Sequence, residues 1–141
     1  LWLSIEDGRR RLASDSRAIG LLNVRAGEWV AANTPKDARI GTIDAGAIRY
    51  LGRRRTIDLV GLNYAPVAFG ATVHPNDVDW LVVWPTGPVP PGLREGFELR
   101  AAFEVPAQEY TVCPCLGQNR QEVMAKKSTA RSGPAVVRPA R

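Results

Sequence analysis

Residues 29–63 constrain the fold most, because strand and helix patterns follow each other there at short intervals. A helix is expected to end before Pro35, since proline cannot continue a helix and disfavours helical geometry at the residue before it. Short strands are predicted over residues 38–43 and 56–60, the second with alternating apolar and polar side chains. Residues 47–51 predict one or two helical turns between them. The segment should therefore form a β-α-β unit.

Glycine and aspartate mark the ends of these elements. Gly46 is expected to provide a tight turn or a close backbone approach after the first strand, and Gly52 is expected to close the short helix. Asp44 and Asp58 stand at or near the two strand ends. Ligands of open α/β sheets bind beyond the carboxyl ends of the strands. The sequence therefore predicts a ligand-binding set made of Asp44, Gly46, Tyr50 and Asp58.

A purely structural interpretation of these residues stays open. Asp44 could be a turn-capping carboxylate that accepts bonds from local backbone N–H groups. Asp58 could instead be the ion-pair partner of Arg53, Arg54 or Arg55. In that case Asp44 and Gly46 would matter for folding before they matter for any ligand.

The same stretch resembles a soluble segment that lies late in many bacterial GT-C-type glycosyltransferases. The resemblance is carried by W-V-A-x-N-T-P-x-D-A, D-A-G-A-I-x-Y-L-G-x-R and I-D-L-x-G-L, and extends weakly over residues 77–85. Those polytopic membrane enzymes transfer a sugar from a polyprenyl-phosphate donor on the extracytoplasmic side. Their catalytic acids lie in loops between membrane helices, so the resemblance implies an accessory domain without catalytic residues of its own.

The rest of the chain completes an α/β fold. Asp15 or Ser16 is expected to cap a helix that buries one face, comprising Ile19, Leu22, Ala26, Trp29 and Val30. Residues 80–84 predict a central strand, and the proline-rich loop 85–92 should follow it at the same edge as Asp44. Residues 97–105 alternate as a half-buried strand, and 110–115 with 121–125 read as a hairpin. We therefore expect a small mixed sheet with a parallel core from the first half and antiparallel strands from the second.

The charge of +5 is concentrated at the C-terminal end. Residues 126–141 contain five basic residues and no acid, which leaves 14 basic against 14 acidic residues in 1–125. We expect 1–125 to be a single domain and 126–141 a weakly integrated segment. Such a basic end suits anionic lipid headgroups, or is a solvated tail. Nucleic acid is not an expected partner, because no basic face with interleaved aromatic residues is evident.

Several kinds of site are disfavoured. A dinucleotide site would need more glycines than Gly46 alone and an acid about 20 residues further on. His74 is the only histidine, and no serine has the context of a nucleophile elbow. Cys113 and Cys115, two residues apart, are a poor zinc signature. No catalytic residue, metal or cofactor is predicted.

Two functions follow as expectations. In the first, the chain is an accessory extracytoplasmic domain of a membrane glycosyltransferase. Its partners would be the transmembrane portion of the parent chain and polyprenyl-phosphate sugar or anionic headgroups. Leu1 in place of an initiator methionine suggests a piece of a longer protein, although no apolar run approaches the ~18 residues of a membrane helix. In the second, it is a free-standing small-ligand or nucleotide-binding α/β domain.

Overall fold

The computed structural model describes residues 2–106 and 119–127, with side chains from residue 4 onwards. The helical elements are α1 (Trp2–Ile19), the π-helical η1 (Gly20–Val24), α2 (Arg25–Asn33), α3 (Ala45–Gly52), α4 (Ala65–Ala68) and the 3-10 turn η2 (Arg94–Gly96). The strands are β1 (Arg39–Thr42), β2 (Arg55–Asp58), β3 (Trp80–Val83), β4 (Phe97–Glu104) and β5 (Arg120–Lys126).

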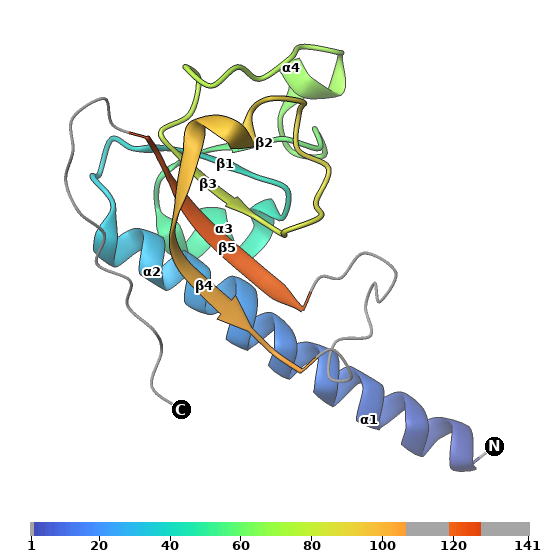
Figure 1. Ribbon diagram of the computed structural model, residues 1–141. Helices are drawn as coiled ribbons and strands as arrows, with labels where there is room; N and C mark the ends of the chain where they lie inside the picture. The colour runs from blue at the N-terminus through green and yellow to red at the C-terminus, as the bar shows by residue number, and fades with distance from the viewer. Residues whose placement is uncertain (1, 107–118, 128–141) are drawn as a thin grey trace.

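Within these residues the strands form one mixed sheet in the order β2-β1-β3-β5-β4 (Figure 1). β1 pairs in parallel with β2 and β3, whereas β5 runs antiparallel to β3 and β4. The predicted α/β fold, with a parallel first half and an antiparallel second half, is confirmed. β5 is flanked by β3 and β4, and the other predicted hairpin arm, 110–115, lies outside the described residues.

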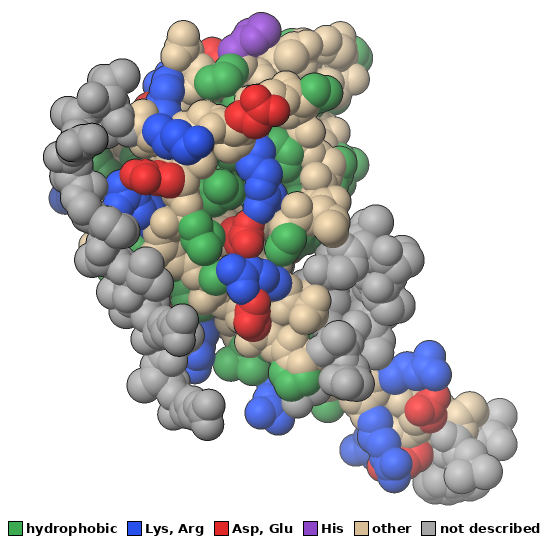
Figure 2. Space-filling view, viewed as in Figure 1, with side chains coloured by type: hydrophobic (Ala, Val, Ile, Leu, Met, Phe, Trp, Pro, Cys, Tyr) green, Lys and Arg blue, Asp and Glu red, His purple; other side chains and the backbone are tan. Residues whose placement is uncertain are grey.

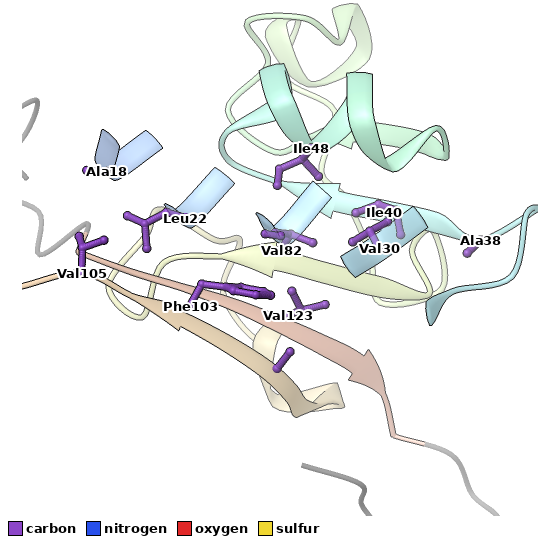
Figure 3. Close-up of a cluster of buried hydrophobic side chains, with 12 residues drawn as sticks. Ala18, Leu22, Val30, Ala38, Ile40, Ile48, Val82, Phe103, Val105 and Val123 are labelled. Atoms are coloured by element: carbon purple, nitrogen blue, oxygen red, sulfur yellow. The ribbon is translucent and has the colours of Figure 1, made fainter. Parts of the chain in front are cut away.

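The N-terminal helix differs from the prediction, because it does not start at Asp15 or Ser16. The backbone stays helical from α1 through η1 into α2, since Ile19 and Arg25 at the junctions both have right-handed helical angles. The buried line consists of residues at a four-residue spacing, Ala18, Leu22, Ala26 and Val30, which pack on the sheet (Figure 3). Ile19, expected on the buried face, is 39% exposed because it lies beside this line.

Two glycines bring α2 and α3 together on this face of the sheet. A Cβ on Gly27 would lie 2.9 Å from the Ala47 carbonyl oxygen, and one on Gly52 would lie 3.1 Å from Val30 Cγ1. Gly52 is the last residue of α3, so the helix ends where expected, but Gly52 is not the left-handed residue of its end. The left-handed closing residue is Arg53, with φ 49°.

The opposite face of the sheet is covered by the connections that follow β2 and β3. Ile57, Leu59, Val73, Val78, Leu93 and Phe97 pack there against Leu81, Val83 and Met124. Leu81, Val82 and Val83 are fully buried, so β3 is the central strand, covered on both faces, that the sequence predicts.

β4 changes faces at an irregularity in its pairing. Its register with β5 shifts between Leu99 and Ala101, as a β-bulge does. Phe97 packs with the loop-side cluster, whereas Ala101 and Phe103 pack with the helices. The simple alternation expected for this strand therefore fails at Leu99, which is 41% exposed.

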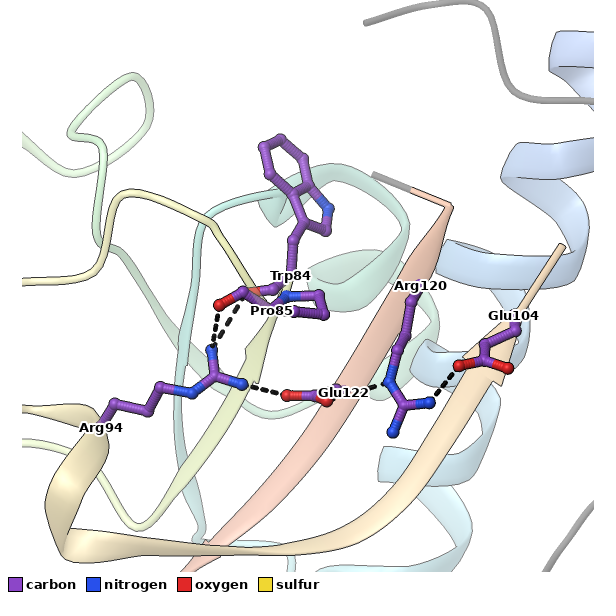
Figure 4. A network of polar contacts seen from close by, with 6 residues as sticks. All are labelled: Trp84, Pro85, Arg94, Glu104, Arg120 and Glu122. Carbon is purple, nitrogen blue, oxygen red and sulfur yellow. Dashed lines mark hydrogen bonds and ion pairs between the residues drawn. The ribbon is translucent and has the colours of Figure 1, made fainter. Parts of the chain in front are cut away.

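A chain of alternating charges ties β4 and β5 to the end of β3 (Figures 2 and 4). Arg94 donates to the carbonyl oxygens of Trp84 at 3.1 Å and Pro85 at 3.2 Å, and pairs with the buried Glu122. Glu122 also accepts from Arg120 at 2.9 Å, and Arg120 pairs with Glu104. Because Glu122 has a guanidinium on each side, its burial is compensated.

The start of the expected C-terminal segment belongs to the fold. Lys126 is the last residue of β5, and the Lys126 ammonium donates to the Asn76 side chain at 2.8 Å. The Lys127 ammonium and backbone N–H donate to the carbonyls of Glu95 and Gly96, each at 2.8 Å. The remainder of the segment lies outside the described residues. Cys113 and Cys115, which precede the segment, lie outside them as well.

Gly27→Ala should destabilise the domain, because its methyl group would meet backbone that cannot move without separating α2 from α3. We expect a loss of about 1–3 kcal/mol in the free energy of unfolding, measured by urea denaturation. Gly8→Ala is the matched control: nothing lies within 4 Å of that position, so stability should stay level or rise. Equal stability of the parent and Gly27→Ala would contradict the close helix packing.

Candidate functional site

The carboxyl ends of the three parallel strands meet at one edge of the sheet, which is where open α/β sheets bind ligands. Thr42, at the end of β1, ties this edge together: its hydroxyl donates to the Val82 carbonyl at 2.8 Å, and its carbonyl accepts from Leu59 N–H at 2.8 Å. Loop 85–92 follows β3 at the same edge, as predicted. Gly87 in that loop lies close against Ile43, directly after β1.

Asp44 is half-buried between β1 and α3. Its backbone N–H donates to the Thr42 hydroxyl at 3.2 Å, and its carboxylate accepts from the Asn23 side-chain amide. The carboxylate makes no hydrogen bond to the first turn of α3, so the turn-capping interpretation is wrong. The partner of the carboxylate is Asn23 instead, because the π-helical segment η1 packs against α3 and presents its buried amide to Asp44.

The surroundings of Asp44 favour its protonated form. Burial raises the pKa of this carboxyl above its ordinary value of 3.8, and the negative charge of Asp58 adds to the rise. The hydrogen bond from Asn23 opposes both effects but does not cancel them. The folded protein therefore binds a proton at Asp44 more tightly than the unfolded chain does.

Asp58 is 3% exposed and organises the loop that follows β2. Its carboxylate accepts backbone N–H bonds from Val60 at 3.0 Å, Gly61 at 3.2 Å and Asn63 at 2.8 Å. The expected ion pair with a neighbouring arginine is therefore wrong. Backbone donors satisfy the carboxylate because the chain folds back over the strand end at Gly61, where φ is +88°.

Arg54, one of the arginines offered as a partner for Asp58, binds helix ends instead. Its guanidinium donates to the carbonyl oxygens of Ala31 and Thr34, both at 2.8 Å, and to that of Gly52 at 3.2 Å. The unpaired carbonyls at the ends of α2 and α3 thereby gain a cationic donor.

An open groove lies beside α3, with a volume of about 410 Å³. Six residues line it: Ala45, Gly46, Arg49, Tyr50, Arg53 and Asn63. Of the four residues that the sequence selects, Gly46 and Tyr50 line the groove, and Tyr50 is 82% exposed. Asp44 and Asp58 do not line it: Asp58 holds Asn63 in place, and Asp44 is bonded to Asn23.

Sequence reasoning missed Arg49, Arg53, Asn63 and Asn23. Arg49 has a usable signal, because it follows Gly46 by three residues and therefore shares its side of the short helix. Asn63 and Asn23 have none, since each is placed by a contact distant in sequence. Among residues 2–106 and 119–127, no three histidine, cysteine or acidic side chains gather as a metal site would require.

Comparison with known proteins identifies a family. The family model described as Domain of unknown function (DUF8728) matches residues 13–125. The chain belongs to the DUF8728 family. The family match spans the whole sheet and most of the helix layer, and it begins part-way along α1. No curated protein and no solved structure matches the chain. Because the DUF8728 description carries no activity, function has to be argued from the site.

Gly46 does not occupy the special position that the sequence suggested. It lies in the first turn of α3 without a positive φ, and nothing lies within 4 Å of a Cβ built on it. Gly46→Ala should therefore stabilise the domain by up to about 1 kcal/mol, seen as a higher Tm. Gly61→Ala is the contrasting variant, with φ +88° and a Cβ at 2.7 Å from Ala68 N, and should cost more than about 1 kcal/mol. A lower Tm for Gly46→Ala would restore the tight-turn interpretation.

Asp44→Asn tests the raised pKa. Since the folded pKa of Asp44 lies above 3.8, its contribution to stability is greatest below 3.8 and declines as pH rises through the folded value. Asparagine has no such decline and still accepts from Asn23. In urea denaturation, the free energy of unfolding of Asp44→Asn should therefore rise relative to that of the parent as pH is raised from 4 to 7.

The control for this experiment is Asp44→Ala. Alanine leaves the Asn23 amide without its acceptor and should cost about 1–3 kcal/mol at both pH values. If Asp44→Asn lowers the free energy of unfolding at pH 7 as much as Asp44→Ala does, the negative charge itself stabilises the fold and the assigned pKa direction is wrong.

Proposed function

We propose that this domain is a non-catalytic accessory part of a longer membrane glycosyltransferase, located on the extracytoplasmic face of the cell membrane. The proposal starts from the resemblance of residues 29–63 to GT-C-type enzymes. One structural observation carries it further: the first half of α1 projects away from the sheet, and residues 4–13 are all exposed (Figures 1 and 2).

A projecting helix of this kind is suited to connecting two bodies. Isolated helices of about 12 residues are marginally stable in water. This segment also exposes Ile5 (51%) and Leu12 (69%), which are apolar side chains that a second body can cover. The ion pairs Glu6–Arg10 at 3.6 Å and Asp7–Arg11 at 3.2 Å add only about 0.2–0.5 kcal/mol each. The transmembrane portion of the parent chain is the partner that we assign to this helix.

The basic side chains of α1 fit a position near a membrane surface. Arg9, Arg10 and Arg11 are consecutive and exposed, and each basic residue near an anionic surface contributes about 1 kcal/mol. Anionic headgroups, including that of a polyprenyl-phosphate sugar, are thus the lipid partners of the proposal. No helix in the described part of the chain is both long and apolar enough to cross a membrane.

Catalysis is assigned to the membrane half of the parent enzyme. Sugar transfer from a polyprenyl phosphate needs a base for the acceptor and a group that stabilises the leaving phosphate. The carboxylates at the sheet edge are engaged within the fold, Asp58 by backbone N–H groups and Asp44 by Asn23. Neither lines the groove where a sugar could lie.

A second candidate is a free-standing small-ligand or nucleotide-binding α/β domain. The groove beside α3 favours it, because three of its lining residues, Ala45, Gly46 and Asn63, follow the strand ends where such domains bind their ligands. The reading frame upstream of Leu1 discriminates between the candidates. Several apolar runs of about 20 residues would support the accessory domain, and their absence would support the free-standing one.

The accessory function predicts different outcomes for the isolated and the joined domain. The purified 141-residue chain, mixed with polyprenyl-phosphate-linked sugars and acceptors, should transfer no sugar above buffer. In the intact parent enzyme, two glycines inserted between Gly8 and Arg9 should lower transfer, because they break the rigid connection that α1 provides. Both are measured by the release of labelled polyprenyl phosphate.

Two outcomes would contradict the proposal. Transfer by the isolated chain that is abolished by Asp44→Ala would make this domain the catalyst. Unchanged transfer after the glycine insertion, in a parent enzyme whose domain still melts as before, would show that α1 is not a functional connector.

A further inference from the structure

We infer that the groove beside α3 binds a phosphate-bearing ligand, held chiefly by Arg49 and Arg53. This goes beyond the accessory role, because it assigns a chemical class of ligand to a particular set of side chains. It stands on the groove alone and holds equally for a domain that works by itself.

The first reason is two positive charges without partners. Arg49 and Arg53 are four residues apart, joined by the backbone bond from Arg53 N–H to the Arg49 carbonyl at 3.2 Å, and both line the groove. Like charges at this spacing repel each other. Within residues 2–106 and 119–127, neither guanidinium has a hydrogen bond or an ion pair.

Three other arginines near the sheet have partners within the fold. Arg39 forms a bidentate pair with Asp79, through bonds of 2.7 and 3.0 Å. Arg54 binds the helix ends, and Arg94 binds carbonyl oxygens and Glu122. Arg49 and Arg53 differ from these three because neither guanidinium has a partner among the described residues and both line the same groove.

The second reason is the backbone of Arg53. With φ 49°, it is the one residue other than glycine with positive φ in the described part of the chain. Left-handed positions at helix ends favour glycine, because a Cβ is strained there. The negative end of α3 attracts a positive charge to this region, but it gives no reason to place a side chain on a left-handed backbone. A residue that keeps its side chain at such a position is a candidate for a functional role.

The third reason is the chemistry of the remaining lining. Guanidinium groups present planar forks that match phosphate oxygens, Tyr50 adds a hydroxyl donor, and Asn63 adds an amide. Gly46 leaves the first turn of α3 open, so backbone can approach a ligand closely. No carboxylate of the described chain lines the groove, and the nearby Asp44 and Asp58 are bonded to Asn23 and to backbone N–H groups. A volume of about 410 Å³ accommodates a phosphate with an attached group.

The direct test is a titration with inorganic phosphate at constant ionic strength, with chloride as the balancing anion. Backbone N–H signals in two-dimensional NMR should shift saturably at Gly46, Arg49, Arg53 and Asn63. Arg49→Gln and Arg53→Gly should each weaken the affinity about tenfold, since each removes a charge-assisted contact. Absence of saturable shifts at these positions would overturn the inference.

Arg53→Gly also separates binding from folding. Because glycine relieves the left-handed backbone, this variant should melt at the same or a higher temperature than the parent while binding phosphate more weakly. A lower melting temperature would mean that the Arg53 side chain supports the fold, and would overturn the inference. The matched control is Arg25→Gln, which removes one exposed charge from α2 outside the groove and should leave phosphate binding unchanged.

Vesicles distinguish the two sources of phosphate. Sedimentation with phosphatidic acid vesicles but not with phosphatidylcholine vesicles, lost in Arg53→Gly, would identify a lipid headgroup as the ligand. Binding of inorganic phosphate without vesicle binding would identify a soluble phosphate ester. Vesicle binding retained in Arg53→Gly, but lost when Arg9, Arg10 and Arg11 are changed to glutamine, would support the accessory role and overturn the groove as the lipid site.

Discussion

The close approach of α2 and α3 is the contact on which the rest of the structure depends. It exists because Gly27 and Gly52 have no Cβ where the two helices meet, and because Arg54 binds the carbonyl ends of both. With the helices fixed in this way, α3 lies over the parallel strands with its first turn at their carboxyl ends. A bulkier residue at either glycine would displace α3 and, with it, the groove residues that α3 carries.

The acidic and basic side chains near the carboxyl ends of the parallel strands have different roles. The acidic groups serve the fold, since Asp58 holds the following loop by three backbone bonds and Asp44 is paired with Asn23. The basic groups at α3 serve nothing within the described chain. Within the part of the chain that the structure describes, the groove beside α3 is therefore lined by two guanidinium groups and by no carboxylate.

Local signals in the sequence account for the parallel half of the fold. Pro35 ends a helix, the strands around Ile40 and Ile57 are short and mix apolar with polar residues, and the unbroken apolar run at residues 80–84 gives the central strand. The features that were missed all depend on contacts distant in sequence. Gly52 has the residue type of a left-handed helix end, yet it packs on Val30 within α3 and the left-handed residue is Arg53. The bulge after Leu99 likewise lets β4 contribute to two clusters on opposite faces of the sheet. The periodicity of the β4 sequence does not reveal it.

Asp44 and Gly46 illustrate the same limit within the site. Their neighbourhood was predicted correctly, because strand ends and turns are encoded locally. Their roles were not, because the partner of Asp44 is 21 residues away and Gly46 has open space around it. The sequence could therefore locate the functional edge of the sheet but could not say which side chains face a ligand there.

The π-helical segment η1 makes the long N-terminal helix two helices of different phase. A π-turn contains one residue more than an α-turn, so residues before Gly20 are rotated by about 100° from where an uninterrupted α-helix would place them. This change of phase fixes the side of the molecule that Arg9, Arg10 and Arg11 face, while Ala18 and Leu22 still pack on the sheet.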